Sequence, residues 1–209
     1  MKTTYSDVYR GYSVNADFSK GWGLYTEILD GIIDQILNLQ NTHSRIHVLR
    51  FDIRIPSKKE YSIETENSQV SALIKAIKSN LALKRWGGHK KVAHGWVREV
   101  GNSGHGHYHV FIAYKSFQRS LGIISDDFYS GTWGLIKSCS ERITGASVHF
   151  SGKAHLINRT DYIRLNDCIY HLSYLAKISS KDFGTGQKHK RYSFSRIKKM
   201  DSIAMQVSW

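Results

Sequence analysis

The stretch VAHGWVREVGNSGHGHYHVFIAY, residues 92–114, has the pattern of a β-hairpin. Both arms are rich in β-branched and aromatic residues, and the turn-forming residues GNSG (101–104) separate them. Alternate side chains of a strand point to the same face, so the second arm is expected to present His105, His107 and His109 together. The fold therefore has to place a histidine-bearing strand inside a sheet.

The segments around the hairpin alternate between strand and helix patterns. IHVLRFDIRIP (46–56) alternates as a strand does, and a short strand is expected near 146–150. From residue 46 the order is β-α-β-β-α-β followed by a helix, which predicts an α+β fold with a ferredoxin/RRM-like antiparallel sheet. We expect its helices on one face, an open catalytic face, and the first and third strands side by side at its centre. Apolar residues recur at helical spacing over about 22–39, 68–85, 126–142 and 166–179.

Charge and composition indicate a globular protein with an anionic partner. Of its 209 residues 41% are hydrophobic, which excludes a disordered chain. Residues 1–66 carry 8 Lys/Arg against 9 Asp/Glu, whereas residues 67–209 carry 22 against 8, so the basic surface belongs to the later part. This favours nucleic acid over a membrane as the partner. By composition we divide the chain into a polar N-terminal segment (1–20), a single domain (21–200) and a C-terminal tail (201–209).

Targeting and cysteine signals are sparse. No stretch approaches the roughly 18 apolar residues of a membrane span, and the polar start is not typical of a signal peptide. Cys139 and Cys168 form no CxxC motif, so neither a zinc knuckle nor a disulfide framework is indicated. We expect an intracellular protein in a reducing compartment.

Polar residues of the first strand are expected on the open face. If Phe51 and Ile53 face the helices, then Arg50, Asp52 and Arg54 face the opposite way. The histidines of the central third strand would then share their surface. A polar cluster on two central strands indicates a binding or catalytic site rather than core.

His107 and His109 are the candidate metal ligands. Two imidazoles at i and i+2, roughly 7 Å apart along a strand, can converge on one divalent ion. Glu99 lies near the turn on the partner strand and is the candidate third ligand, with Asp52 and His105 as alternatives. Such a set with open positions suits Mg²⁺ or Mn²⁺ acting as a Lewis acid on a phosphate.

The segment IYHLSYLAKISSK (169–181) supplies candidate nucleophiles. On a helix Tyr170, Tyr174 and Lys177 fall on one side, opposite an apolar stripe. A tyrosine hydroxyl has a pKa of about 10, so only about one in a thousand is ionised at neutral pH. A nearby ammonium favours the phenolate, and a metal ion stabilises charge on phosphate oxygens. The pattern favours phosphodiester transesterification by Tyr174, with Lys177 one turn away on the same side.

Two enzyme families use a strand of this kind. HGHYHVF is similar to the His-x-His-x-His pattern of histidine-triad nucleotide hydrolases, and HYH resembles the motif of the HUH endonucleases, which cut single-stranded DNA with a tyrosine. The resemblance extends further to the inovirus-type rolling-circle replication initiators of filamentous phages and prophages, related to the YagK/YfjJ C-terminal domain. The four motifs that carry it, in order, are RFDIRIP (50–56), WVREVG (96–101), HYHV (107–110) and LSYLAK (172–177).

This resemblance implies specific roles. His107 and His109 would hold the Mg²⁺ or Mn²⁺, with Glu99 as third ligand. Tyr174 would attack the scissile phosphate of single-stranded DNA at a replication origin and leave a 3′-OH, while Lys177 would position or stabilise the reacting groups. Tyr170 would stack on a base, or would act as a second nucleophile as in initiators that use two tyrosines. Partners would include a host helicase and polymerase, and the location would be the cytoplasm of a bacterial host cell.

DNA contacts are expected from basic residues near this centre. Residues 181–199 carry seven Lys/Arg with Tyr192 and Phe194 interleaved, the composition of a groove that follows a DNA backbone and stacks its bases. The individual candidates are Arg50, Arg54, Lys188, Lys190, Arg191 and Arg196.

Two other interpretations stay open at this level. A histidine-triad hydrolase would act without Tyr174 or Lys177 and would form no covalent DNA adduct. A non-catalytic binder of single-stranded nucleic acid would be unaffected by Tyr174→Phe. A transposase or relaxase of the HUH superfamily would share the chemistry and differ only in its DNA context.

Overall fold

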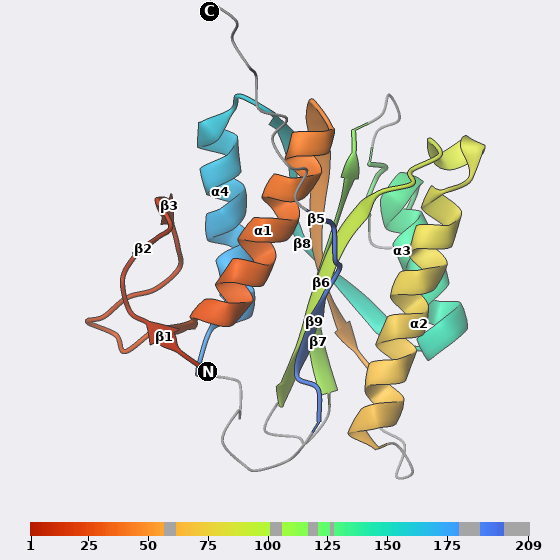
Figure 1. Ribbon diagram of the computed structural model, residues 1–209. Helices are drawn as coiled ribbons and strands as arrows, with labels where there is room; N and C mark the ends of the chain where they lie inside the picture. Colours follow the sequence, from red (N-terminus) through yellow and green to blue (C-terminus); the bar gives the residue numbers. More distant parts are fainter. Residues whose placement is uncertain (57–61, 101–105, 117–120, 126–127, 180–188, 199–209) are drawn as a thin grey trace, which may run out of the picture.

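In a computed structural model of the protein, the predicted hairpin lies within a five-stranded antiparallel sheet (Figure 1). The structure describes residues 1–56, 62–100, 106–116, 121–125, 128–179 and 189–198. The strand order is β8-β5-β7-β6-β9, so the first and third predicted strands are neighbours and the second pairs with the third, as expected. A short edge strand, which the sequence did not reveal, extends the sheet beyond the hairpin. The strands are β5 (Arg45–Arg54), β6 (Val92–Val100), β7 (Gly106–Lys115), β8 (Ser147–Asn158) and β9 (Tyr192–Phe194).

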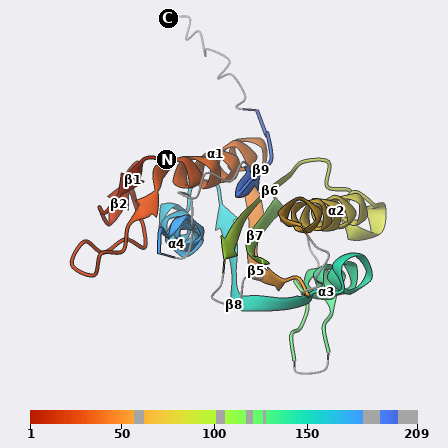
Figure 2. The same cartoon turned by 90° about the horizontal axis from the view of Figure 1, so that it is seen from below.

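Helices cover both faces of the sheet, so the expectation of helices on one face only is wrong. Helices α1 (Thr26–Thr42) and α4 (Tyr162–Ser173) pack on one side, and α2 (Ile63–Leu81) and α3 (Gly131–Thr144) pack on the other (Figure 2). We attribute this to the strand sequences, because strands buried on both faces have continuous apolar runs rather than strict alternation.

The central strands are apolar on both faces along only part of their length. Val48 and Phe111 are buried against α1 and α4, whereas Leu49 and Val110 are buried against α2 and α3. Further along both strands the α1 side becomes polar, with Asp52 and the histidines in place of apolar residues. The polar site is therefore the continuation of a covered face, not an open sheet surface.

The final helix ends earlier than its sequence pattern predicts. Helix α4 stops at Ser173, and residues Tyr174–Ala176 form a single 3-10 turn. The chain then becomes extended, because Lys177 bridges to Leu24 and the Ile178 amide donates to the Gly23 carbonyl at 3.0 Å. This contact with a segment distant in sequence overrides the local helical periodicity.

The first 20 residues, set apart from the domain by their composition, pack on α1 and α4. Strand β1 (Thr3–Thr4) pairs with β4 (Leu24–Tyr25), and β2 (Val8–Tyr9) pairs with β3 (Tyr12–Ser13). Val14 is buried in the α1–α4 core. Helix α1 begins only at Thr26, so Trp22 lies in the turn before β4 and not on the helix where the pattern placed it.

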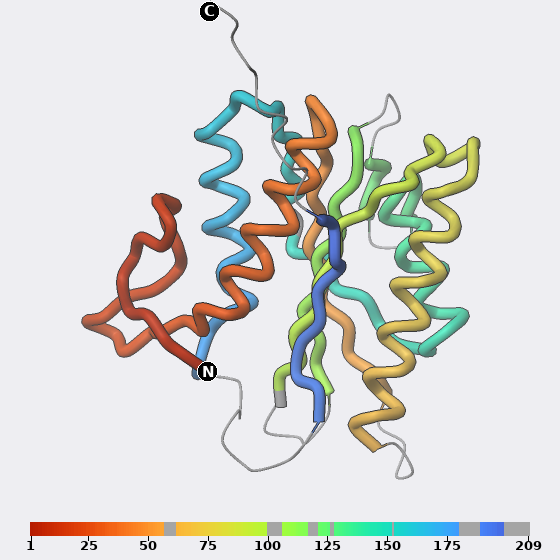
Figure 3. Tube along the Cα trace, in the orientation of Figure 1, coloured from red at the N-terminus to blue at the C-terminus, as the bar shows by residue number. Residues whose placement is uncertain are grey.

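The edge strand β9 uses its aromatic residues for packing. It runs along β6 (Figure 3), and the Phe194 ring occupies the space above Gly31 of α1 and Gly95 of β6. The ring also lies 6.2 Å from the ring of Phe111. The partly buried Phe194 ring therefore packs against the core, and its expected role in stacking on DNA bases stays a prediction. In the described part of the chain no helix is both long and apolar enough to cross a bilayer.

Candidate active site

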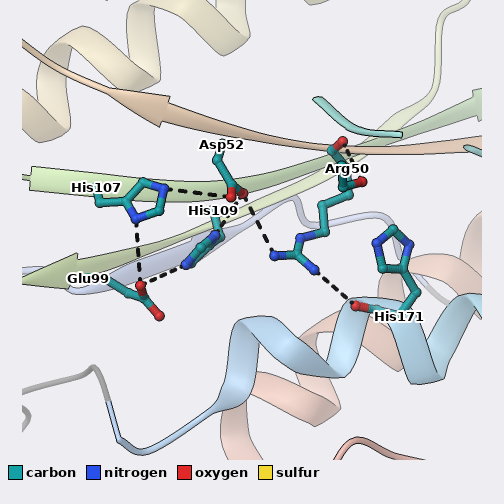
Figure 4. A network of polar contacts seen from close by, with 7 residues as sticks. Arg50, Asp52, Glu99, His107, His109 and His171 are labelled. Atoms are coloured by element: carbon teal, nitrogen blue, oxygen red, sulfur yellow. Dashed lines mark hydrogen bonds and ion pairs between the residues drawn. The ribbon is translucent and has the colours of Figure 1, made fainter. Parts of the chain in front are cut away.

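The two predicted histidines meet two carboxylates from the neighbouring strands. Pairing of β5 with β7 puts Asp52 opposite His109, and pairing of β6 with β7 puts Glu99 opposite His107. The histidine ring centroids are 4.5 Å apart (Figure 4). Ligand atoms of Asp52, His107 and His109 lie within 4.8 Å of one another. The antiparallel register thus brings together the histidines, the predicted third ligand and its alternative.

His109 is held by one carboxylate and faces the other. Its Nδ1 lies 2.7 Å from Asp52 Oδ1 in a hydrogen bond, so Nδ1 is the protonated nitrogen if the ring is neutral. Its Nε2 lies 2.9 Å from Glu99 Oε2, yet it makes no hydrogen bond there and is buried. In the neutral ring, the Nε2 lone pair of His109 faces the Glu99 oxygen. Two electron-rich atoms this close together have the arrangement of two ligands that share a cation.

His107 lies between the same two carboxylates at longer range. Its Nε2 is 3.6 Å from Asp52 Oδ2 and its Nδ1 is 3.6 Å from Glu99 Oε2. Interactions with Asp52 and then Glu99 raise the pKa of His107 to about 9, although burial opposes the shift. Burial would raise the pKa of Asp52, but His107, His109 and Arg50 together hold it well below its ordinary value. The site therefore favours a positive charge between its two carboxylates.

These residues fit a divalent metal ion. Two imidazoles and a carboxylate supply nitrogen and oxygen donors, and Asp52 holds one imidazole in a fixed orientation, as second carboxylates do at metal sites. The buried Nε2 of His109 has no hydrogen-bond partner among the described residues and faces the Glu99 carboxylate, which is itself a candidate ligand. His105, the other alternative ligand, lies outside the described residues.

Tyr174 is the tyrosine that reaches this cluster. Its ring centroid lies 5.4 Å from that of His109, and Arg50 Cζ and Lys177 Nζ lie 4.4 Å and 4.5 Å from the Tyr174 ring. Burial and the charge of Glu99 raise its pKa, while the Arg50 guanidinium lowers it. Burial also lowers the pKa of Lys177. Two cations therefore contact the ring that lies beside the histidines.

Tyr170 is placed differently from Tyr174. It lies on α4 itself, with 48% of its surface exposed, and among the described residues no ring contact or hydrogen bond joins its side chain to the histidine cluster. The two tyrosines do not share a common setting because the helix ends between them. Of the two candidates, the structure brings only Tyr174 to the cluster.

Arg50 is a buried part of the site rather than a surface phosphate contact. It is 8% exposed, lies 3.9 Å from Asp52, and donates a long hydrogen bond of 3.5 Å to the His171 carbonyl (Figure 4). Its Nε has no hydrogen-bond partner among the described residues. The guanidinium thus joins the end of α4 to the carboxylate at the centre of the sheet.

A protein-family comparison classifies the chain. The YagK/YfjJ C-terminal domain matches residues 9–195. The chain belongs to this family. No curated protein and no solved structure shows significant similarity to the chain. In this YagK/YfjJ C-terminal domain the matched range contains the histidine cluster, Tyr174 and Lys177, together with most of the N-terminal segment.

The other predicted DNA contacts of this YagK/YfjJ domain are spread along the sheet. Arg54 is exposed and pairs with His107 across the strands. The Arg191 carbonyl accepts a hydrogen bond from the Arg98 amide, next to Glu99, so the chain at 190–191 passes near the site. Arg196 instead lines a basic cavity at the other end of β6, and Lys188 lies outside the described residues. The cavity with Arg196 is also lined by Lys78, Lys90, Lys91 and Lys198.

The sequence did not predict two contacts around the Lys177–Tyr174 pair, those of Trp22 and Arg50. The ammonium of Lys177 lies 4.7 Å from the ring of Trp22, which the periodicity had assigned to a helix. Arg50 was expected on the surface but lies against Tyr174. For Trp22 the flanking glycines in GWG were a usable turn signal. Nothing in the local sequence of Arg50 indicates its partner.

Proposed function

We propose that this YagK/YfjJ domain is a metal-dependent endonuclease and strand transferase of the HUH type that initiates rolling-circle replication, as inovirus initiators do. The observation that carries the proposal is the position of Tyr174 beside the His107–His109 pair, with Asp52 and Glu99 around them. The strand order β8-β5-β7-β6, with both central strands carrying the site, also suits the ferredoxin-like sheet that the proposal requires.

The proposed reaction is one transesterification. The Tyr174 oxygen attacks the scissile phosphorus, the bond from phosphorus to the 3′ oxygen breaks, and the 5′ phosphate becomes joined to the tyrosine. The leaving 3′ oxygen takes up a proton and becomes a free 3′-OH, while the tyrosine proton is lost to solvent or to a neighbouring base. A second nucleophilic 3′-OH can reverse the step, which rejoins the strand without an energy cofactor.

The charges around Tyr174 explain why a cation is required. Burial and the negative charge of Glu99 raise the pKa of Tyr174, and this opposes formation of the phenolate nucleophile. Arg50 and Lys177, with their cations 4.4 Å and 4.5 Å from the ring, offset part of this effect. A Mg²⁺ or Mn²⁺ ion held by His107, His109 and Glu99 would neutralise the carboxylate charge and stabilise charge on the phosphate oxygens.

Arg50 and Lys177 have separate roles in this proposal. The Arg50 guanidinium is buried and positions the Tyr174 ring. Lys177 follows the 3-10 turn in an extended conformation, and its ammonium beside the Tyr174 ring would pair with a phosphate oxygen of the bound strand. Arg54 and the segment at 190–191 would contact the DNA backbone, with a host helicase and polymerase acting after the nick.

A covalent-transfer assay tests the proposal. Purified protein is incubated with the single-stranded origin DNA of its own replicon in Mn²⁺ or Mg²⁺ and separated on a denaturing gel. Label placed 3′ of the cut should move to the protein band, and Tyr174→Phe or EDTA should abolish the transfer. Tyr170→Phe is the matched control, because Tyr170 is exposed and removed from the cluster, and it should retain the adduct.

Three other outcomes would correct or overturn the proposal. Loss of the adduct in Tyr170→Phe but not in Tyr174→Phe would keep the mechanism and change the nucleophile. Nucleotide hydrolysis that persists in Tyr174→Phe would indicate a histidine-triad hydrolase. DNA binding without cleavage of a verified origin in either metal would indicate a non-catalytic binder.

A further inference from the structure

Three aromatic side chains of the N-terminal segment are exposed to solvent. Phe18 is 81% exposed, and Tyr5 and Trp22 are each 41% exposed. They form one cluster, because the rings of Tyr5 and Phe18 meet edge to face at 6.1 Å, and the Asp17–Trp22 bridge closes the turn that holds Phe18. Large aromatic residues exposed together on a polar segment indicate a contact surface rather than core.

This aromatic cluster (Tyr5, Phe18 and Trp22) is continuous with the active site. The Lys177 ammonium lies 4.7 Å from the Trp22 ring centroid and 4.5 Å from the Tyr174 ring centroid. The backbone bridge from Leu24 to Lys177 holds the two segments in this relation. Trp22 and Tyr174 therefore lie on either side of a single cation, close enough for adjacent nucleotides of one strand to reach both.

The cluster is also locally cationic, although the first third of the chain is not basic. Lys20 Nζ lies 4.8 Å from the Trp22 ring, and the Lys20 side chain is 58% exposed. Lys20 also pairs with Asp17 at 2.8 Å, and because ion pairs near the surface contribute little stability, a phosphate could replace the carboxylate. Aromatic rings interleaved with ammonium groups are the combination that binds single-stranded nucleic acid, because bases stack while phosphates pair with the cations.

We propose that Phe18 and Trp22 form a platform on which an unpaired base of the DNA substrate stacks, next to the phosphate attacked by Tyr174. The assignment of the ligand as single-stranded DNA rests on the proposed function. The platform would orient a strand at the nucleophile by stacking, which needs no particular base. It also selects against duplex, in which both faces of each base are already stacked.

Equilibrium binding separates this proposal from the chemistry. Fluorescence anisotropy is measured in EDTA with a labelled single-stranded oligonucleotide of mixed sequence and with its duplex. Phe18→Ala is the main variant, because its ring is almost fully exposed and its loss leaves the core intact. The matched control is Tyr162→Ala, an aromatic residue 75% exposed at the opposite end of α4. Phe18→Trp tests rescue by another stacking ring.

We expect Phe18→Ala to raise the Kd for single strands by about 5- to 100-fold, the effect of losing one stacked base. Tyr162→Ala and Phe18→Trp should stay within about twofold of the unmodified protein, and the Kd for duplex should be unchanged in all variants. An unchanged Kd in Phe18→Ala, or an equal loss for duplex, would overturn the platform. Platform-dependent binding without a covalent adduct would reject the Tyr174 chemistry and leave the platform intact.

Discussion

A buried ion pair behind the histidine strand gives a sharp prediction about stability. Arg98 of β6 is 3% exposed, and its Nε and Nη2 donate to Glu66 Oε2 of α2 at 3.1 Å and 2.9 Å. Tyr108, between the two histidines, donates to Asn67 at 2.9 Å on the same side. This network joins α2 to the strand that carries the candidate site, so its loss should affect both stability and site geometry.

The expected size of the effect follows from burial. Arg98→Met removes two charge-assisted hydrogen bonds and leaves the Glu66 carboxylate buried without its cation, which costs about 3–5 kcal/mol. Glu66→Gln leaves the Arg98 guanidinium buried beside a neutral group and should cost a comparable amount. The double variant leaves no unpaired buried charge at positions 66 and 98, so it should be more stable than either single variant.

Urea unfolding at pH 7 measures this double-mutant cycle, with circular dichroism as the signal. The control is Lys137→Met, because Lys137 forms an exposed pair with Glu141 at 3.4 Å, and it should change the free energy of unfolding by less than about 0.5 kcal/mol. A double variant less stable than both single variants would refute the reasoning. So would an Arg98→Met cost of the same size as the Lys137→Met control.

Three further predictions concern other parts of the domain. Burial lowers the pKa of His155 and of His171 to about 4, below their ordinary value of 6.5, so the unfolded chain binds more protons than the folded one between these values. The free energy of unfolding should therefore keep its full value above about pH 6.5 and fall by about 2 kcal/mol towards pH 4, after allowance for solvent screening. Unfolding midpoints that do not change across this pH range would contradict the prediction. Gly106→Ala should lower the free energy of unfolding by about 1–3 kcal/mol, because the added Cβ would collide with the Glu66 carboxylate. A thermal unfolding curve equal to that of the unmodified protein would show that the Glu66 side chain moves aside without cost. Asp52→Asn should weaken Mn²⁺ binding by about 10- to 100-fold, since Asp52 orients His109, and Glu99→Gln should weaken it further. Isothermal titration calorimetry checks this order, and the reverse order would make Asp52 the ligand in place of Glu99.

Local patterns in the sequence were sufficient for the sheet and for the histidine pair. A strand repeats every two residues, so His107 and His109 had to share a face once the hairpin was recognised, and the register then placed Asp52 and Glu99 beside them. The second face of the sheet was predicted incorrectly. The alternation in RFDIR was extended to the whole strand, although its first half, IHVL, buries Ile46 and Val48 on one face and Leu49 on the other.

The sequence by itself predicted the four long strands of the sheet, their pairing and the candidate metal ligands, because these depend on short periodic patterns. Only the tertiary structure gave Tyr174 and Tyr170 different settings, since helix α4 ends at Ser173 and the 3-10 turn that follows places Tyr174 beside His109. It likewise brought Trp22 to the site, although its periodicity had assigned it to a helix. Such contacts join residues far apart along the chain and are specified by the packing of the whole domain, which no local pattern records.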